Sequence, residues 1–199
     1  MNKTLMTVRG QPVILNKNGV IEFISGMTID ADGGYRTYAP KDSGLSPLDY
    51  LENAGHPGNW YGIVTVDGVP VVQGKDDPCP GYYVSPTTYQ NKGFKITNPR
   101  RYLDSENVAF VVVPGPLRKL VQPVIIGCRA TITNIRNGIT IEAVVGDVGP
   151  ATHLGEASMK AAELLGVNSN PKVGGSNNRV FKYMIYPGVA AEGYELQPI

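Results

Sequence analysis

Apolar and polar residues alternate in several short segments of the chain. Residues 129–135 and 139–145 follow this pattern, and Asn137-Gly138 lies between them. Such alternation is typical of strands with one buried face, and Asn-Gly favours a tight hairpin turn. Similar patterns predict two more hairpins, over residues 12–25 around Asn18-Gly19 and over residues 61–73 around Asp67-Gly68.

Other apolar segments predict further strands and two short helices. Residues 109–113 are apolar without alternation, as in a strand that is buried on both faces. Ser46-Pro47 is typical of a helix start and Gly55 of its end, and a second helix is predicted to run from about residue 153 or 155 to 165. With strands also over residues 82–84 and 180–186, the pattern predicts a mainly β (α+β) chain that folds as a barrel or sandwich.

Length and composition favour one domain over residues 1–199. The 199 residues are 42% hydrophobic, enough for one core, and the 24 glycines and 16 prolines indicate many turns. The hairpin within residues 1–26 is interpreted as a possible N-terminal extension. The formal net charge of +1, without a dense basic cluster, argues against a nucleic-acid or membrane surface, and we expect a monomer.

Few residues suit a metal or a disulfide framework. The two cysteines, Cys79 and Cys128, either form one bridge or are unrelated thiols, and two histidines cannot build a His-rich site. Asp30 and Asp32 precede two glycines as in the start of a calcium loop, but the remaining ligands are missing. We therefore expect neither metal nor cofactor.

The segment with the clearest candidate chemistry is residues 146–158. Asp147 follows the strand over 139–145, and Glu156 lies nine residues later, at the predicted start of the second helix. Two carboxyl groups that face one cleft are what glycoside hydrolysis requires. The alternative is structural: Asp147 caps its own turn, and Glu156 complements the helix dipole and pairs with Lys160.

Five motifs in order resemble the glycoside hydrolase family 75, the fungal-type chitosanases, across about residues 28–175. They are Ile29-Asp30-Ala31-Asp32-Gly33, Gly58-Asn59-Trp60-Tyr61-Gly62, Asp76-Asp77-Pro78 with Gly81-Tyr82-Tyr83, Arg101-Tyr102-Leu103-Asp104-Ser105, and Gly146-Asp147-Val148-Gly149-Pro150 with Leu154-Gly155-Glu156-Ala157-Ser158. The resemblance implies a six-stranded double-psi β-barrel. It also implies an endo-acting enzyme that hydrolyses β-1,4-linked glucosamine polymer with inversion.

The resemblance assigns roles to the two acids of the 146–158 segment. Asp147 would be the general base and Glu156 the general acid, and Asp30 and Asp32 would form a substrate-facing acidic turn. A difficulty follows for Glu156, because a helix N-terminus and Lys160 both favour its ionised form, and an acid must be protonated. Burial would have to outweigh them, or the enzyme would work at acidic pH.

Aromatic and acidic residues of the other motifs are candidates for substrate binding. Trp60, Tyr61 and Tyr83 could offer flat apolar faces to sugar rings, although a core position is an alternative for Trp60. Asp76 and Asp77 are adjacent like charges, so at least one should be solvated or meet a cation, for which a glucosamine ammonium is a hypothesis.

Two other functions remain open from the sequence. The same chemistry could act on peptidoglycan, or the barrel could bind carbohydrate without cleaving it. The family is expected to be secreted, yet residues 1–9 lack the apolar stretch and cleavage site of a signal peptide. The sequence therefore leaves the localisation open.

Overall fold

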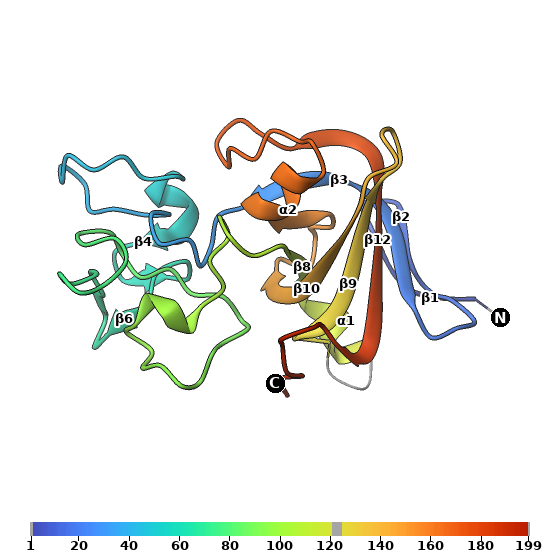
Figure 1. The fold of residues 1–199 in the computed structure, drawn as a ribbon, viewed down its shortest axis with the longest axis horizontal. Coiled ribbons are helices and arrows are strands. Elements are labelled where there is room, and N and C mark those ends of the chain that lie inside the picture. The colour runs from blue at the N-terminus through green and yellow to red at the C-terminus, as the bar shows by residue number, and fades with distance from the viewer. Residues whose placement is uncertain (1, 121–124, 199) are drawn as a thin grey trace.

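Six strands form a closed barrel in the computed structural model, which describes residues 2–120 and 125–198. Pairing of the first strand with the last closes the ring, which lies on the right in Figure 1. In order around the barrel the strands are β3 (Ile21–Asp30), β11 (Glu156–Ser158), β8 (Phe110–Pro114), β10 (Thr140–Gly149), β9 (Cys128–Asn134) and β12 (Ser176–Ala190).

Around the ring, two pairs of adjacent strands are parallel, and the other pairs of adjacent strands are antiparallel. Strand β11 runs parallel to β3, and β10 runs parallel to β8. The predictions of a mainly β chain and of a six-stranded double-psi barrel are confirmed. The predicted hairpin of β9 and β10 is present, with Thr133 opposite Thr140, and β8 is buried at all five positions.

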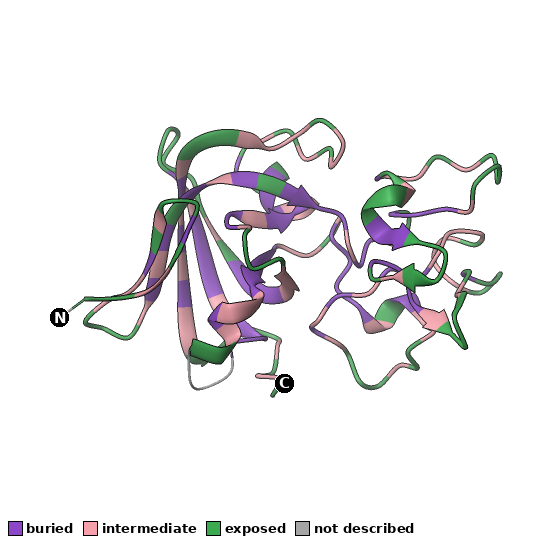
Figure 2. Cartoon of the chain, turned by 180° about the vertical axis from the view of Figure 1, so that it is seen from behind, coloured by how far each residue is buried: buried purple, intermediate pink, exposed green. Residues whose placement is uncertain are grey.

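The barrel interior is filled by side chains from every strand. Phe23 of β3 stacks on Tyr183 of β12, with 4.8 Å between the ring centroids. Phe110, Ile132 and Phe181 are also almost fully buried. Figure 2 shows that buried residues follow the barrel strands.

A hairpin of β1 (Lys3–Val8) and β2 (Gln11–Leu15) extends the sheet beyond the barrel. Strand β2 pairs with β3, placing Ile14 opposite Glu22, as the predicted hairpin over residues 12–25 requires. The β1–β2 turn consists of Arg9 and Gly10, both with positive φ. Two such residues match the type of turn that suits the twist of paired strands.

Residues 31–102 form a second part of the molecule, which we call the lobe; it lies on the left in Figure 1. Its regular elements are short: η1 (Leu51–Ala54), β4 (Gly55–His56), β5 (Asn59–Trp60), β6 (Thr65–Val66), β7 (Val69–Pro70) and η2 (Pro99–Arg101). Two small apolar clusters fill it, one around Tyr38 and Ile63 and the other around Val84 and Tyr102.

The helix predicted over residues 46–55 is wrong except for its last turn, η1. The backbone N–H groups of Leu48 and Asp49 donate to the carbonyls of Arg36 and Thr37 instead of to a helix. The Asp49 carboxylate then accepts from the Tyr50 N–H and the Asn53 amide. Tertiary pairing thus replaces the local helical pattern.

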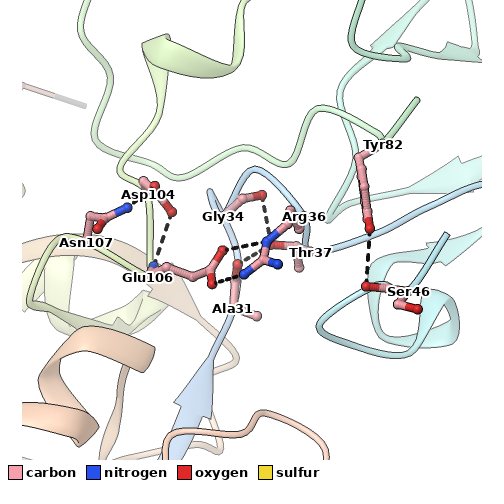
Figure 3. Close-up of polar contacts among 9 residues, drawn as sticks. All are labelled: Ala31, Gly34, Arg36, Thr37, Ser46, Tyr82, Asp104, Glu106 and Asn107. Atoms are coloured by element: carbon pink, nitrogen blue, oxygen red, sulfur yellow. Dashed lines mark hydrogen bonds and ion pairs between the residues drawn. The ribbon is translucent and has the colours of Figure 1, made fainter. Parts of the chain in front are cut away.

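The start of the lobe is tied to the segment that leads into β8 (Figure 3). The Arg36 guanidinium donates to both oxygens of Glu106, at 2.6 and 3.3 Å. Thr37 Oγ1 donates to the Ala31 carbonyl at the end of β3, and Asp104 accepts from the Glu106 N–H and from Asn107. These contacts fix the exit of β3 next to the entry of β8.

The second predicted helix begins later than the sequence suggests. Helix α2 spans Met159–Leu164, and Glu156 lies in strand β11. The other α-helix of the described residues is α1 (Gly115–Leu120). Gly155 has φ +87°, and a Cβ there would lie 2.4 Å from the Gly26 carbonyl oxygen, so the chain passes close to β3 in a non-helical conformation. The prediction that Glu156 opens a helix is therefore wrong.

Ser158 joins β11, β8 and α2 through one buried hydroxyl. Its Oγ accepts from the Phe110 and Ala161 N–H groups, at 3.0 and 3.2 Å, and donates to the Val108 carbonyl at 2.7 Å. We expect Ser158→Ala to lower the free energy of unfolding by about 2–3 kcal/mol, because it leaves buried backbone groups unpaired and removes the helix cap. Urea denaturation measures this.

The matched control for Ser158→Ala is Ser43→Ala, because the Ser43 hydroxyl forms only one exposed contact with the described residues, to the Leu45 N–H at 3.4 Å. That change should stay within about 0.5 kcal/mol of the wild type. Equal unfolding midpoints for the two variants would contradict the assigned role of Ser158.

Candidate active site

Strand register brings Asp147 and Glu156 to the same level of the barrel. Both residues pair with Val112 of β8, Asp147 from the β10 side and Glu156 from the β11 side. Residues directly opposite one another in a sheet point to the same face. Because neighbouring strands lie about 4.8 Å apart, the two Cα atoms are about 10 Å apart across β8.

The same row continues onto β3, where Thr28 pairs with Glu156. All four residues of the row line one open groove of about 640 Å³. The other groove residues come from the end of β3, from the lobe, from the end of β10 with the residue after it, and from the segment between α2 and β12: Ile29, Asp30, Ala31, Asp32, Tyr38, Asp49, Asn53, Tyr61, Pro86, Thr87, Thr88, Val148, Gly149, Pro150 and Pro171. The groove is thus built by both parts of the molecule.

One oxygen of Asp147 accepts every hydrogen bond that this carboxylate forms with the described residues. The Thr88 N–H and hydroxyl donate to Oδ1 at 3.0 and 2.5 Å, and the Val148 N–H donates at 2.6 Å. The strand bulges at Gly146, whose carbonyl accepts from the Tyr89 N–H. A bulge changes the direction of the side chains beside it, and here the Asp147 carboxylate lies against Thr88 of the lobe.

The pKa of Asp147 is the outcome of opposing effects. Burial, the largest effect, raises it above the ordinary value; the hydrogen bonds from Thr88 and Val148 and the positive charge of Arg118 lower it, but the net shift is upward. Donors that bind a carboxylate favour its ionised form.

Glu156 has no such donors in the described residues. Burial and then the neighbouring charge of Asp147 raise its pKa to about 7. Its Oε2 lies close to Gly149 at the end of β10, 2.9 Å from where a Cβ would stand. Lys160 is paired with Glu163 instead, at 2.9 Å, so neither a helix start nor Lys160 holds Glu156 ionised.

Asp30 and Asp32, at and after the end of β3, add two more acids to the groove. Burial, followed by the charge of Asp32, raises the pKa of Asp30 well above its ordinary range. Burial and the charge of Asp147 raise the pKa of Asp32 to about 8, although Tyr38 and Ser85 donate hydrogen bonds to it at 2.8 and 3.2 Å. With Asp49, five carboxyl side chains line the groove, and none of the described residues lining it is Lys, Arg or His.

The other predicted substrate-binding residues divide into one that lines the groove and four that do not. Tyr61 lines it and is 66% exposed. Trp60 packs against the apolar cluster of the lobe around Tyr38, as its core alternative predicted. Tyr83 also packs there, Asp76 is exposed, and Asp77 accepts from the Gly74 N–H and lies 3.9 Å from Arg100.

Sequence patterns did not identify Thr88, Tyr38 or Asn53 as groove residues. Thr88 and Tyr38 come from irregular parts of the lobe, where no periodicity signals which side chain faces which way, and Asn53 lies in the short η1 turn. Tyr38 follows the Asp30 motif by a few residues, which was the only available signal.

Metal and disulfide chemistry receive no support from the described residues. No group of three or more His, Cys, Asp or Glu side chains within residues 2–120 and 125–198 is arranged to hold a metal ion. Cys79 lies in the lobe and Cys128 is buried in β9, and no disulfide joins them. None of the helices in the described part of the chain is long and apolar enough to cross a membrane.

Comparison of the chain with known protein families and with curated proteins finds no match.

Proposed function

We propose that the chain is an endo-acting glycoside hydrolase that cleaves β-1,4-linked glucosamine polymer by an inverting acid/base mechanism. The observation that carries the proposal is the placement of Asp147 and Glu156 on either side of Val112 in one groove, in unlike environments. The resemblance to family 75 of the glycoside hydrolases supports the same roles for the same two residues.

The unlike environments support different roles for the two acids, one as the general base and one as the general acid. Asp147, with three donors on one oxygen, suits the ionised base that deprotonates water. Glu156, with a pKa raised to about 7, suits the protonated acid that gives its proton to the departing sugar oxygen.

The spacing of the two acids is compatible with inversion. Inverting enzymes hold their carboxyl groups about 6.5–9.5 Å apart, so that water fits between one of them and the sugar, whereas retaining enzymes hold them about 5–5.5 Å apart. Two Cα atoms about 10 Å apart, with side chains on one face, leave room for the larger separation.

The charge of the groove favours an amino sugar over its N-acetylated form. Five carboxyl groups without a basic side chain line the groove, and their mutual repulsion adds to burial in raising the pKa values of Asp30, Asp32 and Glu156; a bound cation would relieve this repulsion and favour the ionised forms. A glucosamine ammonium supplies positive charge, while an acetamide does not. This argues for chitosan over fully acetylated peptidoglycan.

Two measurements test the proposal. The chain should release new reducing ends from chitosan, more slowly as acetylation rises, and release few from acetylated cell-wall sacculi. Proton NMR of the first products should show the α-anomer. Binding of chitosan without release of any product would favour the non-catalytic alternative. A β-anomer among the first products would contradict inversion.

The activity should follow a bell-shaped pH profile. Its alkaline limb should fall near pH 7, because Glu156 loses the proton that it must donate as the pH rises through its raised pKa. Its acidic limb should report protonation of Asp147, and both limbs belong to the coupled pair of acids. A pH series of kcat/KM measures this, and a rate that stays constant up to pH 9 would contradict the role of Glu156.

Thr88 should set the acidic limb. We expect Thr88→Val to move this limb to higher pH and to lower kcat about tenfold, because the loss of one charge-assisted donor raises the pKa of Asp147. Thr88→Ser keeps the hydroxyl and should restore the wild-type profile. Superimposable acidic limbs for Thr88→Val and the wild type would show that the hydroxyl does not tune Asp147.

A further inference from the structure

A second hollow, of about 270 Å³, adjoins the acidic groove and has the opposite character. Thr28 lines both, and its hydroxyl lies 3.0 Å from His153 Nε2. The hollow is formed by the β1–β2 turn, the middle of β3, the loop before β11 and the start of β12. Its charged or potentially charged lining residues in the described chain are Arg9, His153 and Arg179, and no acid is among them.

The two arginines have no ionic partner among the residues that the structure describes. Neither Arg9 nor Arg179 forms an ion pair within residues 2–120 and 125–198. They reach the hollow from different elements, Arg9 from the β1–β2 turn and Arg179 from β12. Two guanidinium groups around one hollow are suited to a carboxylate or another planar anion.

Irregular backbone brings both arginines to this place. Arg9 has φ +47°, a left-handed conformation that is uncommon for a residue with a side chain. Strand β12 bulges beside it: Met27 pairs with Ser176 and Ser25 with Phe181, so residues 177–180 lie opposite Gly26 alone. Bulges often redirect side chains at binding sites.

A buried acceptor without a donor lines the same hollow. Gln11 Oε1 is buried and forms no hydrogen bond with the described residues. An unpaired buried acceptor costs about 1–3 kcal/mol, and because Oε1 is closed off from solvent, the Gln11 side chain has to turn toward the hollow before a bound group can donate a hydrogen bond and remove the cost. A carbohydrate hydroxyl donates one, whereas an inorganic anion offers mainly acceptors.

We propose that this hollow binds a sugar that carries a carboxylate, with Arg9 and Arg179 holding the carboxylate and Gln11 accepting from a hydroxyl. Because the hollow meets the groove at Thr28, opposite Glu156, a bound acidic sugar would lie beside the glucosamine polymer in the groove. This second step rests on the proposed function; the binding site itself does not.

The proposal gives the N-terminal hairpin a role. Val8 ends β1, Arg9 lies in the β1–β2 turn, and Gln11 begins β2. All three residues line the hollow. The hairpin lies outside the six barrel strands, so closure of the barrel does not require it. The hairpin would extend substrate recognition beyond the acidic groove.

A pair of matched sugars tests the site. N-acetylmuramic acid differs from N-acetylglucosamine by a lactyl ether that bears the carboxylate. Titration of the full ¹⁵N-labelled chain should shift the amides of Arg9, Thr28, His153 and Asn177 with the acidic sugar, with an affinity at least about tenfold above that of the neutral one. Equal affinities, or no shifts, would overturn the proposal.

Variants assign the effect to the arginines. Arg9→Asn keeps a residue that tolerates positive φ, so the turn should persist, and it should weaken binding of the acidic sugar about tenfold, as should Arg179→Ala. Arg136→Asn, on the exposed β9–β10 turn, is the matched control and should change nothing. Undiminished binding in both Arg9→Asn and Arg179→Ala would overturn the assignment.

Two further outcomes separate this site from its alternatives. Phosphate that shifts the same amides as strongly as the acidic sugar would indicate a general anion site and overturn recognition of a sugar. Failure of the chain to cleave chitosan would remove the proposed function but leave the binding result intact. Cleavage of chitosan without binding of the acidic sugar would remove only this inference.

Discussion

Asp147→Asn is expected to lower kcat on chitosan by about 10³-fold or more, which is the range for loss of a general acid or base. The asparagine keeps an oxygen in the position of Oδ1, where Thr88 and Val148 donate, so the side chain should stay in place. It places an amide where the proton-accepting oxygen was. The measured loss therefore reports the chemistry of the base and not its geometry.

The assay is release of reducing ends at the pH optimum, with circular dichroism to verify the fold. Asp76→Asn is the control, since this acid is exposed and lies outside the groove. Azide, a nucleophile that needs no base, should restore part of the Asp147→Asn activity and yield a glycosyl azide of inverted configuration. Activity within tenfold of the wild type would contradict the role of Asp147.

Much of the barrel could be predicted because it follows local rules. The β9–β10 hairpin has alternation and an Asn-Gly turn, and β8 is an uninterrupted apolar run, so both strands carry their own signal. Closure of the ring came from the family resemblance, because pairing of β3 with β12 joins segments far apart in sequence.

Strand β11 could not be predicted because its local pattern and its tertiary pairing disagree. The sequence pattern predicts residues 156–158 as part of the first turn of a helix. In the fold, β3 and β8 offer backbone partners on both sides, and the close approach of Gly155 to Gly26 prevents a helical start. Long-range hydrogen bonds therefore outweigh local propensity.

This shift changes the chemistry of the site. A helix start and Lys160 would have held Glu156 ionised, whereas a strand residue buried beside Asp147 has its pKa raised. The acidic residues at 30 and 32 were likewise visible in the sequence, but Tyr38 and Ser85, which hydrogen-bond to Asp32, come from irregular segments of the lobe. Such partners depend on the tertiary fold alone.

Glu156→Gln is expected to lower kcat on chitosan by about 10³-fold, because glutamine cannot donate a proton to the departing sugar oxygen. The change is nearly isosteric, so the close contact with Gly149 should persist. It also removes a buried group whose ionised form is disfavoured, so the variant should be at least as stable as the wild type above pH 7. Urea denaturation at pH 8 measures this part of the prediction.

The leaving group separates the two acids. A glucosamine oligomer with fluoride at the anomeric carbon needs no protonation to depart, so Glu156→Gln should hydrolyse it at a rate within about tenfold of the wild type. Asp147→Asn should remain slow on the same substrate, because water must still be deprotonated. Equal losses on fluoride and on chitosan for Glu156→Gln would contradict its role as the acid, since only the chitosan leaving group requires the proton that Glu156 supplies.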